Sequence, residues 1–233
     1  MIRIGTSGYN YPEWRGSFYP EKFPVAKMLP YYAERFSTVE INYTFYRMPN
    51  AKTIADWVAE TPPGFSFTLK ASQRITHYAR LRDIEDPLRY FLDTAAGLGP
   101  KLGSVLFQLP PNFKKDLERL GGLLALLPAG LRCAFEFRHE SWFADDVYER
   151  LRASNAALCV ADTEDATTPL EVTADWGYFR LRDQGYPAAG LEEWSRTIRR
   201  LSSGWREVFV YFKHEEAGTG PAFARQLEEF LNS

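Results

Sequence analysis

The stretch Arg132-Cys133-Ala134-Phe135-Glu136-Phe137-Arg138 decides how this chain of 233 residues folds. Bulky or apolar residues take its odd positions from 133 on, and the small or charged residues Ala134, Glu136 and Arg138 take the even ones. This period of two predicts a β-strand with one apolar face. The apolar face must pack against helices, so the face that carries Glu136 is predicted to point into a barrel.

The same alternation recurs in three other segments, each with one bulky apolar face and one polar face. The polar faces carry Thr38, Glu40 and Asn42, then Ser66, Thr68, Lys70 and Ser72, and then Tyr178, Arg180 and Arg182. The polarity of these faces rises toward the C-terminal end of each segment. Because barrel proteins build their sites at the C-terminal ends of their strands, we expect the cleft there.

Short apolar runs alternate with amphipathic segments from end to end, which is typical of repeated βα units on a parallel sheet. The predicted strands are Ile2 to Gly5, Thr38 to Ile41, Phe65 to Ala71, Gly103 to Leu109, Arg132 to Phe137, Ala156 to Ala161, Gly177 to Leu181 and Glu207 to Phe212. The predicted helices are Ala26 to Phe36, Ala51 to Glu60, Pro87 to Gly97, Asp116 to Leu127, Ala144 to Ala153, Leu191 to Leu201 and Pro221 to Leu231. Eight strands in this order predict an α/β fold, a TIM-type (β/α)8-like barrel, formed by residues 1–233 as a single domain.

The sixth unit is predicted to be irregular. The stretch from Thr163 to Trp176 is short and contains Thr167-Thr168-Pro169, which leaves little room for a helix. A parallel crossover needs about a dozen residues, so this connection is just long enough. An open doubly wound sheet is the alternative fold.

Composition and charge exclude few functions. A net charge of -2 and an isoelectric point near 6.0 provide no global field that would collect nucleic acid or anionic membrane. The chain starts directly in a strand pattern, without a signal segment or an apolar run that spans a bilayer, so we expect a cytoplasmic protein that does not enter the membrane. Cys133 and Cys159 lie among apolar neighbours in predicted strands and are interpreted as small core residues.

The inward charges allow two interpretations. Burying isolated charges is costly, so they must be paired, solvated in a cleft, or both. They could form a functional site, or an internal salt-bridge network with Glu40 on Lys70 and Glu136 on Arg180. The predicted members are Glu40, Lys70, Glu136, Arg138, Asp162, Arg180 and Lys213, together with Gln108 and Tyr211.

A set of motifs spread over the whole chain resembles the YecE-like family, known as domain of unknown function 72. The motifs are Gly5-Thr6-Ser7-Gly8-Tyr9-Asn10-Tyr11-Pro12-Glu13-Trp14-Arg15-Gly16-Ser17-Phe18-Tyr19-Pro20, Thr38 to Arg47, Lys70 with Ile75-Thr76-His77, Leu106-Phe107-Gln108-Leu109-Pro110-Pro111, Phe135-Glu136-Phe137-Arg138-His139 with Ser141-Trp142, the Arg180 strand, and Val210-Tyr211-Phe212.

The resemblance implies a barrel similar to the TIM type and no established activity. The chain departs from a frequent form of the family at two strand ends. It has Lys213-His214-Glu215-Glu216 where a pair of Asn is common, and Leu181-Arg182-Asp183 where Leu-His-Gly is common. Ligand roles at those two ends are therefore not carried over.

The first functional hypothesis is a cofactor-free hydrolase, lyase or isomerase that acts on an anionic or sugar-like small molecule. Glu136 would be the general acid or base, with Glu40 as its partner. The expected substrate-binding residues are Lys70, Gln108, Arg138, Asp162, Arg180, Asn42, Tyr9, Trp14, Tyr46, His77, Trp142 and Tyr211, with Tyr43 completing an aromatic rim for stacking.

A retaining glycosidase needs two carboxylates about 5 Å apart. Barrel glycosidases resemble one another in placing these carboxylates after strands four and seven. Gln108 and Arg180 stand at those places here, which argues against that particular chemistry.

The second hypothesis is a phosphodiester or nucleic-acid ligand. Basic and aromatic residues are interleaved in the loops at Trp14-Arg15, at Tyr46-Arg47 and from Arg74 to Arg82. The opposing interpretation is that Trp14 belongs to a packed lid over the barrel mouth.

No cofactor is predicted. Dinucleotide and P-loop motifs are missing, and Ser7 in Gly5-Thr6-Ser7-Gly8 is interpreted as a hydrogen-bonding residue of the cleft because the motif is not a nucleophile elbow. His77, His139 and His214 each follow a strand and are the candidate metal ligands, but their spacing fits no compact ligand motif. Such histidines more commonly hydrogen-bond to a loop or a carboxylate.

The third hypothesis is a non-catalytic binding protein that uses the same cleft. A catalyst predicts a carboxylate whose pKa is strongly shifted in a dry cleft. A pure binder or a structural network predicts full pairing of the carboxylates and no titration near neutrality.

Overall fold

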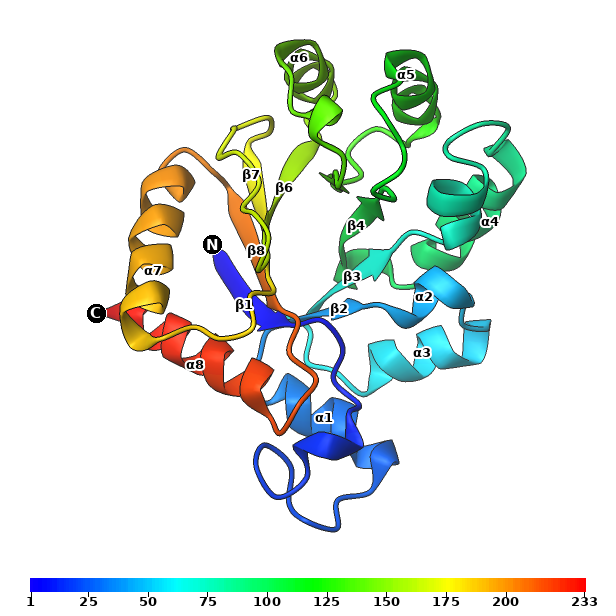
Figure 1. Ribbon diagram of the computed structural model, residues 1–233. Helices are drawn as coiled ribbons and strands as arrows, with labels where there is room; N and C mark the ends of the chain where they lie inside the picture. Colours follow the sequence, from blue (N-terminus) through cyan, green and yellow to red (C-terminus); the bar gives the residue numbers. More distant parts are fainter.

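Eight parallel strands form the centre of the molecule in the computed structural model, which describes residues 1–233 (Figure 1). Their order in the sheet is β1-β8-β7-β6-β5-β4-β3-β2, so each strand lies beside its neighbours in the sequence. The strands are β1 Ile2–Thr6, β2 Thr38–Ile41, β3 Ser66–Lys70, β4 Leu102–Gln108, β5 Cys133–Glu136, β6 Ala157–Asp162, β7 Trp176–Leu181 and β8 Glu207–Phe212.

Helices surround these strands, as Figure 1 shows. They are α1 Met28–Ala33, α2 Tyr43–Tyr46, α3 Ala51–Ala59, α4 Glu85–Ala96, α5 Leu117–Leu126, α6 Asp145–Ala153, α7 Ala188–Ser202 and α8 Thr219–Asn232. Short 3-10 helices span Pro12–Trp14, Val25–Lys27, Gly99–Lys101 and Glu140–Trp142, and a π-helix spans Arg74–Tyr78.

Side-chain caps begin two of the helices, α3 and α5. The Asn50 side chain accepts a hydrogen bond from the Thr53 backbone N–H at 2.8 Å, and Asp116 accepts one from the Arg119 N–H at 3.0 Å. Each cap satisfies a backbone donor that has no partner within its helix. The short α2 and the π-helix were not predicted, because each is too short to show a hydrophobic period.

The barrel is nearly closed, which rules out the alternative of an open doubly wound sheet. β1 and β2 meet through a single parallel bridge between Ser7 and Glu40, and the Gly8 N–H donates to the Glu40 carbonyl oxygen at 2.7 Å. Gly5 permits this closure, because a Cβ atom there would lie 2.2 Å from the Thr38 carbonyl oxygen. The predicted (β/α)8 barrel is confirmed.

The sixth unit lacks a helix, as predicted. The connection between β6 and β7 is an irregular segment that Thr173 holds against the barrel. The Thr173 hydroxyl accepts from the Leu158 N–H and donates to the Ala156 carbonyl oxygen, both at 2.7 Å. These bonds replace the packing that a crossover helix would supply.

The apolar residues form an outer core and an inner one. A cluster of 50 buried residues lies between strands and helices, and a cluster of nine fills the barrel interior. Cys133 is in the outer core and Cys159 in the inner one, and both are free thiols, as the sequence predicted.

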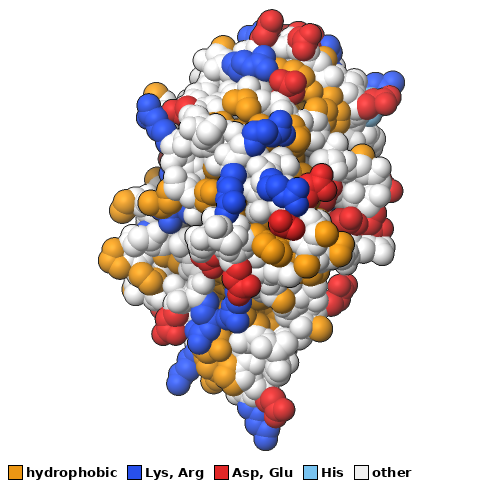
Figure 2. Space-filling model, turned by 90° about the vertical axis from the view of Figure 1, so that its left-hand side faces the viewer, with side chains coloured by type: hydrophobic (Ala, Val, Ile, Leu, Met, Phe, Trp, Pro, Cys, Tyr) orange, Lys and Arg blue, Asp and Glu red, His pale blue; other side chains and the backbone are white.

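Figure 2 shows a face of the molecule on which basic and acidic side chains are interspersed among apolar ones, so neither charge dominates it. None of the helices is both long and apolar enough to cross a membrane.

We predict that Gly5→Ala destabilises the protein, because the added methyl group overlaps the Thr38 carbonyl oxygen at the closure between β1 and β2. Overpacking of this kind costs about 1–3 kcal/mol, and occasionally more. The urea midpoint of the variant should fall accordingly.

Gly122→Ala is the matched control, since a Cβ atom there meets nothing within 4 Å and the position lies inside α5. That substitution should leave the urea midpoint unchanged or raise it. Equal midpoints for the wild type and Gly5→Ala would contradict the tight closure.

Candidate functional site

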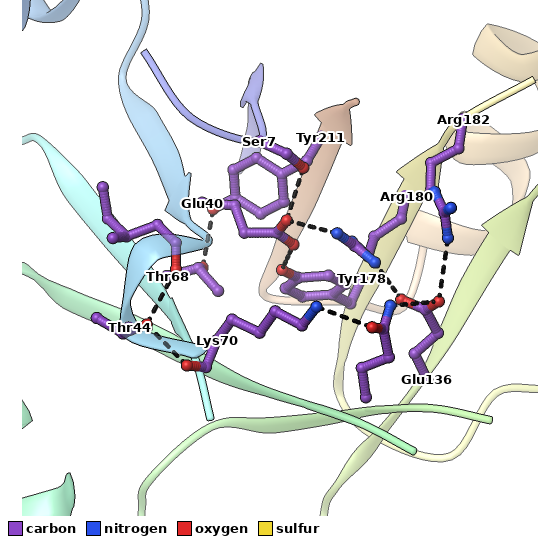
Figure 3. A network of polar contacts seen from close by, with 12 residues as sticks. Ser7, Glu40, Thr44, Thr68, Lys70, Glu136, Tyr178, Arg180, Arg182 and Tyr211 are labelled. Carbon is purple, nitrogen blue, oxygen red and sulfur yellow. Dashed lines mark hydrogen bonds and ion pairs between the residues drawn. The ribbon is translucent and has the colours of Figure 1, made fainter. Parts of the chain in front are cut away.

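A buried guanidinium holds two carboxylates together inside the barrel (Figure 3). Arg180 on β7 donates from Nη2 to Oε1 of Glu40 on β2 at 2.9 Å, and from Nη1 to Oε2 of Glu136 on β5. All three side chains are at most 1% exposed. The predicted pair of Glu136 with Arg180 is confirmed. The predicted pair of Glu40 with Lys70 is wrong, because Glu40 binds Arg180 instead.

Two hydroxyl groups complete the shell around Glu40. The Ser7 hydroxyl donates to Glu40 Oε1 at 2.6 Å, and the Tyr178 hydroxyl donates to Oε2 at 2.5 Å. Burial alone would raise the pKa of Glu40, but the charge of Arg180 and these donors outweigh it and lower the pKa below its usual value. Ser7 is therefore a hydrogen-bonding residue, as the sequence indicated.

Three further donors surround Glu136. Gln108 Nε2 lies 2.8 Å from its Oε1, Arg138 Nε lies 3.1 Å from it and Arg182 Nη1 lies 3.4 Å from it. Burial opposes ionisation of Glu136, but the charges of Arg180 and its two arginine neighbours dominate and hold the pKa well below its usual range.

This environment corrects the expectation that Glu136 and Glu40 act as a general acid and base. Both carboxylates are buried, fully paired and ionised well below neutral pH. A general acid or base needs a pKa near the working pH and access to its substrate, and neither carboxylate has these.

Lys70 extends the network from the barrel interior to the surface. Its Nζ donates to Gln108 Oε1 at 2.8 Å, and the other end of the Gln108 amide binds Glu136. Nζ also lies 4.0 Å from the centre of the Phe45 ring. Burial lowers the pKa of Lys70 to about 7, and the charge of Arg180 acts in the same direction. The pKa of Lys70 therefore lies near neutrality.

A layer of hydroxyl groups lies beneath the charges. The Tyr211 hydroxyl is 2.7 Å from Thr38 Oγ1 and 2.8 Å from Thr68 Oγ1, and Thr68 in turn bonds to Ser104. Tyr211 is fully buried there, so it fills the barrel interior and does not contact ligand as expected. Residue alternation placed Tyr211 on the correct face but does not give its depth.

A cleft of about 1410 Å³ opens at the C-terminal ends of the first strands, where the sequence places the site. It extends from the barrel mouth over α2, α3 and α4. Its lining includes six of the expected residues, Tyr9, Asn42, Tyr43, Tyr46, Lys70 and Lys213, and also Tyr11, Arg47, Arg74, Asp86, Tyr90 and Glu215.

Most polar groups in this lining have no partner. The side chains of Arg47, Arg74 and Lys213 make neither a hydrogen bond nor an ion pair with the protein, whereas Asp86 is paired with Arg89. Burial and the charge of Arg180 lower the pKa of Lys213. The side-chain amide of Asn42 is also unpartnered. The cleft therefore offers unpaired cations to a ligand.

The aromatic rim differs from the expected one. Trp14 and Trp142 are fully buried, so they cannot stack on a ligand. The Trp14 indole N–H donates to the Glu215 carbonyl oxygen at 2.9 Å, and that of Trp142 donates to the Phe113 carbonyl oxygen at 2.7 Å. Both anchor loops at the mouth, as in the packed-lid interpretation.

Three exposed tyrosines supply the aromatic side chains of the cleft, and two of them, Tyr43 and Tyr46, belong to the expected rim. Tyr43, Tyr46 and Tyr90 are each more than half exposed and line it. Tyr90 was missed at the sequence level. Tyr90 could have been found from the sequence, because it is an aromatic residue on the polar face of the predicted helix Pro87 to Gly97.

Asp162 is a further correction, because its side chain points away from the barrel interior. Ala161 belongs to the inner core, so the next residue along β6 faces the other way. The Asp162 carboxylate accepts from Thr167 Oγ1 at 2.5 Å and from the Tyr186 hydroxyl at 2.8 Å, which fixes the loops after β6 and β7.

The three histidines have separate surroundings and do not converge. His77 packs edge-on against Phe45, His139 accepts from the Ser141 N–H at 3.2 Å, and His214 bonds to the Asp183 carbonyl oxygen. Burial and the charge of Lys70 lower the pKa of His77 to about 4. No group of three or more His, Cys, Asp or Glu side chains is placed to hold a metal ion.

The remaining expected residues lie beside or below the cleft. Gln108 is buried between Lys70 and Glu136, and Arg138, whose side chain is 34% exposed, stands beside Glu136 on the β5 side. The two strand ends that depart from the frequent family form contribute Arg182, which pairs with Glu136, and Lys213, which lines the cleft.

Comparison with known proteins gives relatives that are named as UPF0759 proteins. A protein named UPF0759 protein YunF from Bacillus subtilis is 28% identical over 271 aligned positions, which cover all of this chain and 95% of the relative. UPF0759 protein YecE from Escherichia coli is 32% identical over 145 positions, which cover 62% of this chain and 51% of that relative.

Solved structures show the same fold. A DUF72 family protein from Thermotoga maritima superposes with a TM-score of 0.87 at 26% identity, and all of both chains is covered. An endo-beta-1,4-glucanase from Xanthomonas axonopodis superposes with a TM-score of 0.55 at 12% identity, covering all of this chain and 99% of the glucanase, which is a likeness of fold alone. The family model described as "Protein of unknown function DUF72" matches residues 3–233. The chain therefore belongs to the DUF72 family.

Proposed function

We propose that the protein binds an anionic small molecule in the cleft at the barrel mouth and acts on it as a cofactor-free hydrolase, lyase or isomerase. The observation that carries this proposal is the set of unpaired cations, Arg47, Arg74 and Lys213, in the lining of the cleft. These three cations share one cleft with the amine of Lys70. Phosphate and carboxylate groups are the ligands that guanidinium and ammonium groups bind best.

Lys70 is the proton-transfer group in this proposal, and it replaces Glu136. Lys70 lines the cleft, and burial lowers its pKa to about 7, so it exchanges a proton at neutral pH. Glu40 and Glu136 are positioning residues, because they fix Arg180 and, through Gln108, Lys70. A pure binding protein would need no group of this kind, which is why we favour an enzyme over the non-catalytic alternative.

The likeness to a glucanase does not extend to its chemistry. Glu40 and Glu136 are both occupied by Arg180, and the ends of β4 and β7 carry Gln108 and Arg180 in place of carboxylates. The carboxylate pair that a glycosidase needs is thus unavailable in this barrel.

A phosphodiester or nucleic-acid ligand is the second candidate. The exposed rings of Tyr43, Tyr46 and Tyr90 share the cleft with Arg47 and Arg74, and aromatic and basic side chains together bind single-stranded nucleic acids. An affinity for short single-stranded oligonucleotides that falls steeply with salt would favour this candidate. No affinity at low salt would eliminate it.

Phosphorylated ligands should bind more tightly than neutral ones. We predict that calorimetry detects binding of glucose 6-phosphate but not of glucose, because the unpaired cations recognise the phosphate. Lys213→Gln should weaken that binding about tenfold or more, since a hydrogen bond to a charged group contributes about 1.5–3 kcal/mol.

Lys52→Gln is the matched control, because Lys52 is exposed, pairs with Asp56 and lies outside the lining of the cleft. The affinity of this variant for glucose 6-phosphate should equal that of the wild type. Equal binding of glucose and glucose 6-phosphate would overturn the anionic ligand.

The positioning role of Glu136 predicts a pH-dependent stability. Its pKa is lower in the folded chain than the ordinary value of 4.5, so the unfolded chain takes up a proton first as the pH falls. The contribution of ionised Glu136 to the free energy of unfolding is therefore complete above pH 4.5 and is lost progressively below it. We predict that the wild type loses stability steeply below this pH in urea titrations.

Glu136→Gln should be less stable by about 3–5 kcal/mol at pH 7, because it leaves buried Arg180 with one partner fewer. Its stability should also depend less on pH below 4.5. A variant as stable as the wild type, with the same dependence on pH, would show that the ion pair does not support the barrel.

A further inference from the structure

We infer that Lys70 is a nucleophile that forms a covalent imine with the carbonyl group of an anionic aldehyde or ketone bound in the cleft. This inference deepens the proposed function and rests on it, because it names the reacting group of the ligand and the bond that the protein makes to it.

The first argument is the position of Lys70. It ends β3 at the barrel mouth and lines the cleft of about 1410 Å³, which contains no cysteine or histidine among its lining residues. Its Nζ is held between the Phe45 ring, at 4.0 Å from the ring centre, and Gln108 Oε1, at 2.8 Å. An amine that is fixed at one end of an open cleft can meet a carbonyl carbon in a defined geometry.

The second argument is the absence of a counterion. Lys70 makes no ion pair, and its one hydrogen-bond partner is the neutral amide of Gln108. The two carboxylates nearby are occupied by Arg180, so neither contacts the ammonium group. The charged form of Lys70 is therefore poorly compensated, and the neutral amine is favoured.

The charges that face Lys70 from the surrounding elements give the same result. Glu40 and Glu136 favour its protonated form, whereas burial, Arg180 and Arg138 disfavour it, and the pKa falls to about 7. His77, which faces the same region, has its own pKa lowered to about 4 and is neutral at that pH. About half of the Lys70 side chains are then neutral at pH 7, compared with fewer than about one in a thousand for an ordinary lysine.

The third argument is the charge around the amine. Lys213, Arg47 and Arg74 line the same cleft without partners, so an anionic group on the ligand would be held beside Lys70. Asn42 belongs to the same lining, and its buried side-chain amide has no hydrogen-bond partner within the protein.

The chemistry balances without any further reactant. The lone pair of Nζ forms the C–N bond, the carbonyl π electrons move to oxygen, and a proton passes from nitrogen to that oxygen through water. The resulting carbinolamine loses water to give the imine. A protonated imine withdraws electrons from the adjacent bond, which is the step that lyases and isomerases acting on carbonyl compounds use. Hydrolysis of the imine releases the product and restores the amine.

Reductive trapping tests the inference with the wild-type protein. Glyoxylate, the smallest anionic aldehyde, would be added with sodium cyanoborohydride at pH 7, and labelled lysines would be identified by mass spectrometry of peptides. We expect Lys70 to be labelled at least about tenfold faster than exposed Lys52, and the rate to be half-maximal near pH 7.

Three comparisons separate the amine from the anion site. Lys213 lies in the same cleft and serves as the internal control for access, so it should also be labelled more slowly than Lys70. Acetaldehyde, which is neutral, should label Lys70 more slowly than glyoxylate does. In Lys70→Arg the rapid labelling should disappear without transfer to Lys213.

The outcomes distinguish this inference from the proposed function. Labelling of Lys70 no faster than that of Lys52, in a protein that still binds glucose 6-phosphate, would overturn the imine and leave the anion site in place. Rapid labelling of Lys70 by both aldehydes at equal rates, without binding of glucose 6-phosphate, would support the reactive amine and overturn the anionic ligand.

Discussion

The contact between Arg180 and the two carboxylates of Glu40 and Glu136 is the interaction on which the rest of the structure depends. It joins β7 to β2 and β5 across the barrel interior, where each partner is at most 1% exposed. Charges at this depth are tolerated only when they are paired and hydrogen-bonded. The planar guanidinium meets this condition because it donates to both carboxylates at once. Glu40 also receives the Ser7 hydroxyl, so the network extends to the place where β1 and β2 close the barrel.

This network determines what the mouth of the barrel can do. The negative charges are neutralised below the surface, whereas Lys213, Arg47 and Arg74 above it have no partners. Gln108 links the buried ion pairs to Lys70 in the cleft, because its side-chain amide hydrogen-bonds to Glu136 at one end and to Lys70 at the other. The result is an electropositive cleft with one amine that titrates near neutrality. The salt-bridge network that the sequence presents as one alternative is present in the barrel, and in our proposal the functional site lies directly above it.

Alternation of residues along the strands predicted the fold and the centre of the site. Glu40, Glu136 and Arg180 were assigned to the barrel interior because each interrupts an apolar pattern with a period of two, and the structure places them there. Alternation alone does not give depth along the strand, which is why Tyr211 was expected in the cleft although it lies beneath the charges. Asp162 follows the predicted strand that ends at Ala161, and because Ala161 faces inward, Asp162 faces away from the barrel interior.

The loops were harder to predict, because their packing depends on contacts between distant residues. The sequence around a loop tryptophan looks the same whether its side chain stacks on a ligand or packs inside the protein and anchors the loop. Trp14 and Trp142 anchor their loops, because each donates its indole N–H to a backbone carbonyl oxygen. The pairing of Lys70 with Gln108 in place of Glu40 depends on side-chain reach between strands, which the sequence pattern does not encode.

The most direct test of this account is the titration of the glutamate carboxyl groups by carbon-detected NMR on protein labelled at the side-chain carboxyl carbon. The account predicts that the signals of Glu40 and Glu136, assigned with single Gln substitutions, show no titration of these carboxyl groups near neutral pH, because both groups remain ionised beside Arg180. A carboxyl signal of either residue that titrates near neutral pH would contradict the account, and would return the acid or base of the site to the glutamates.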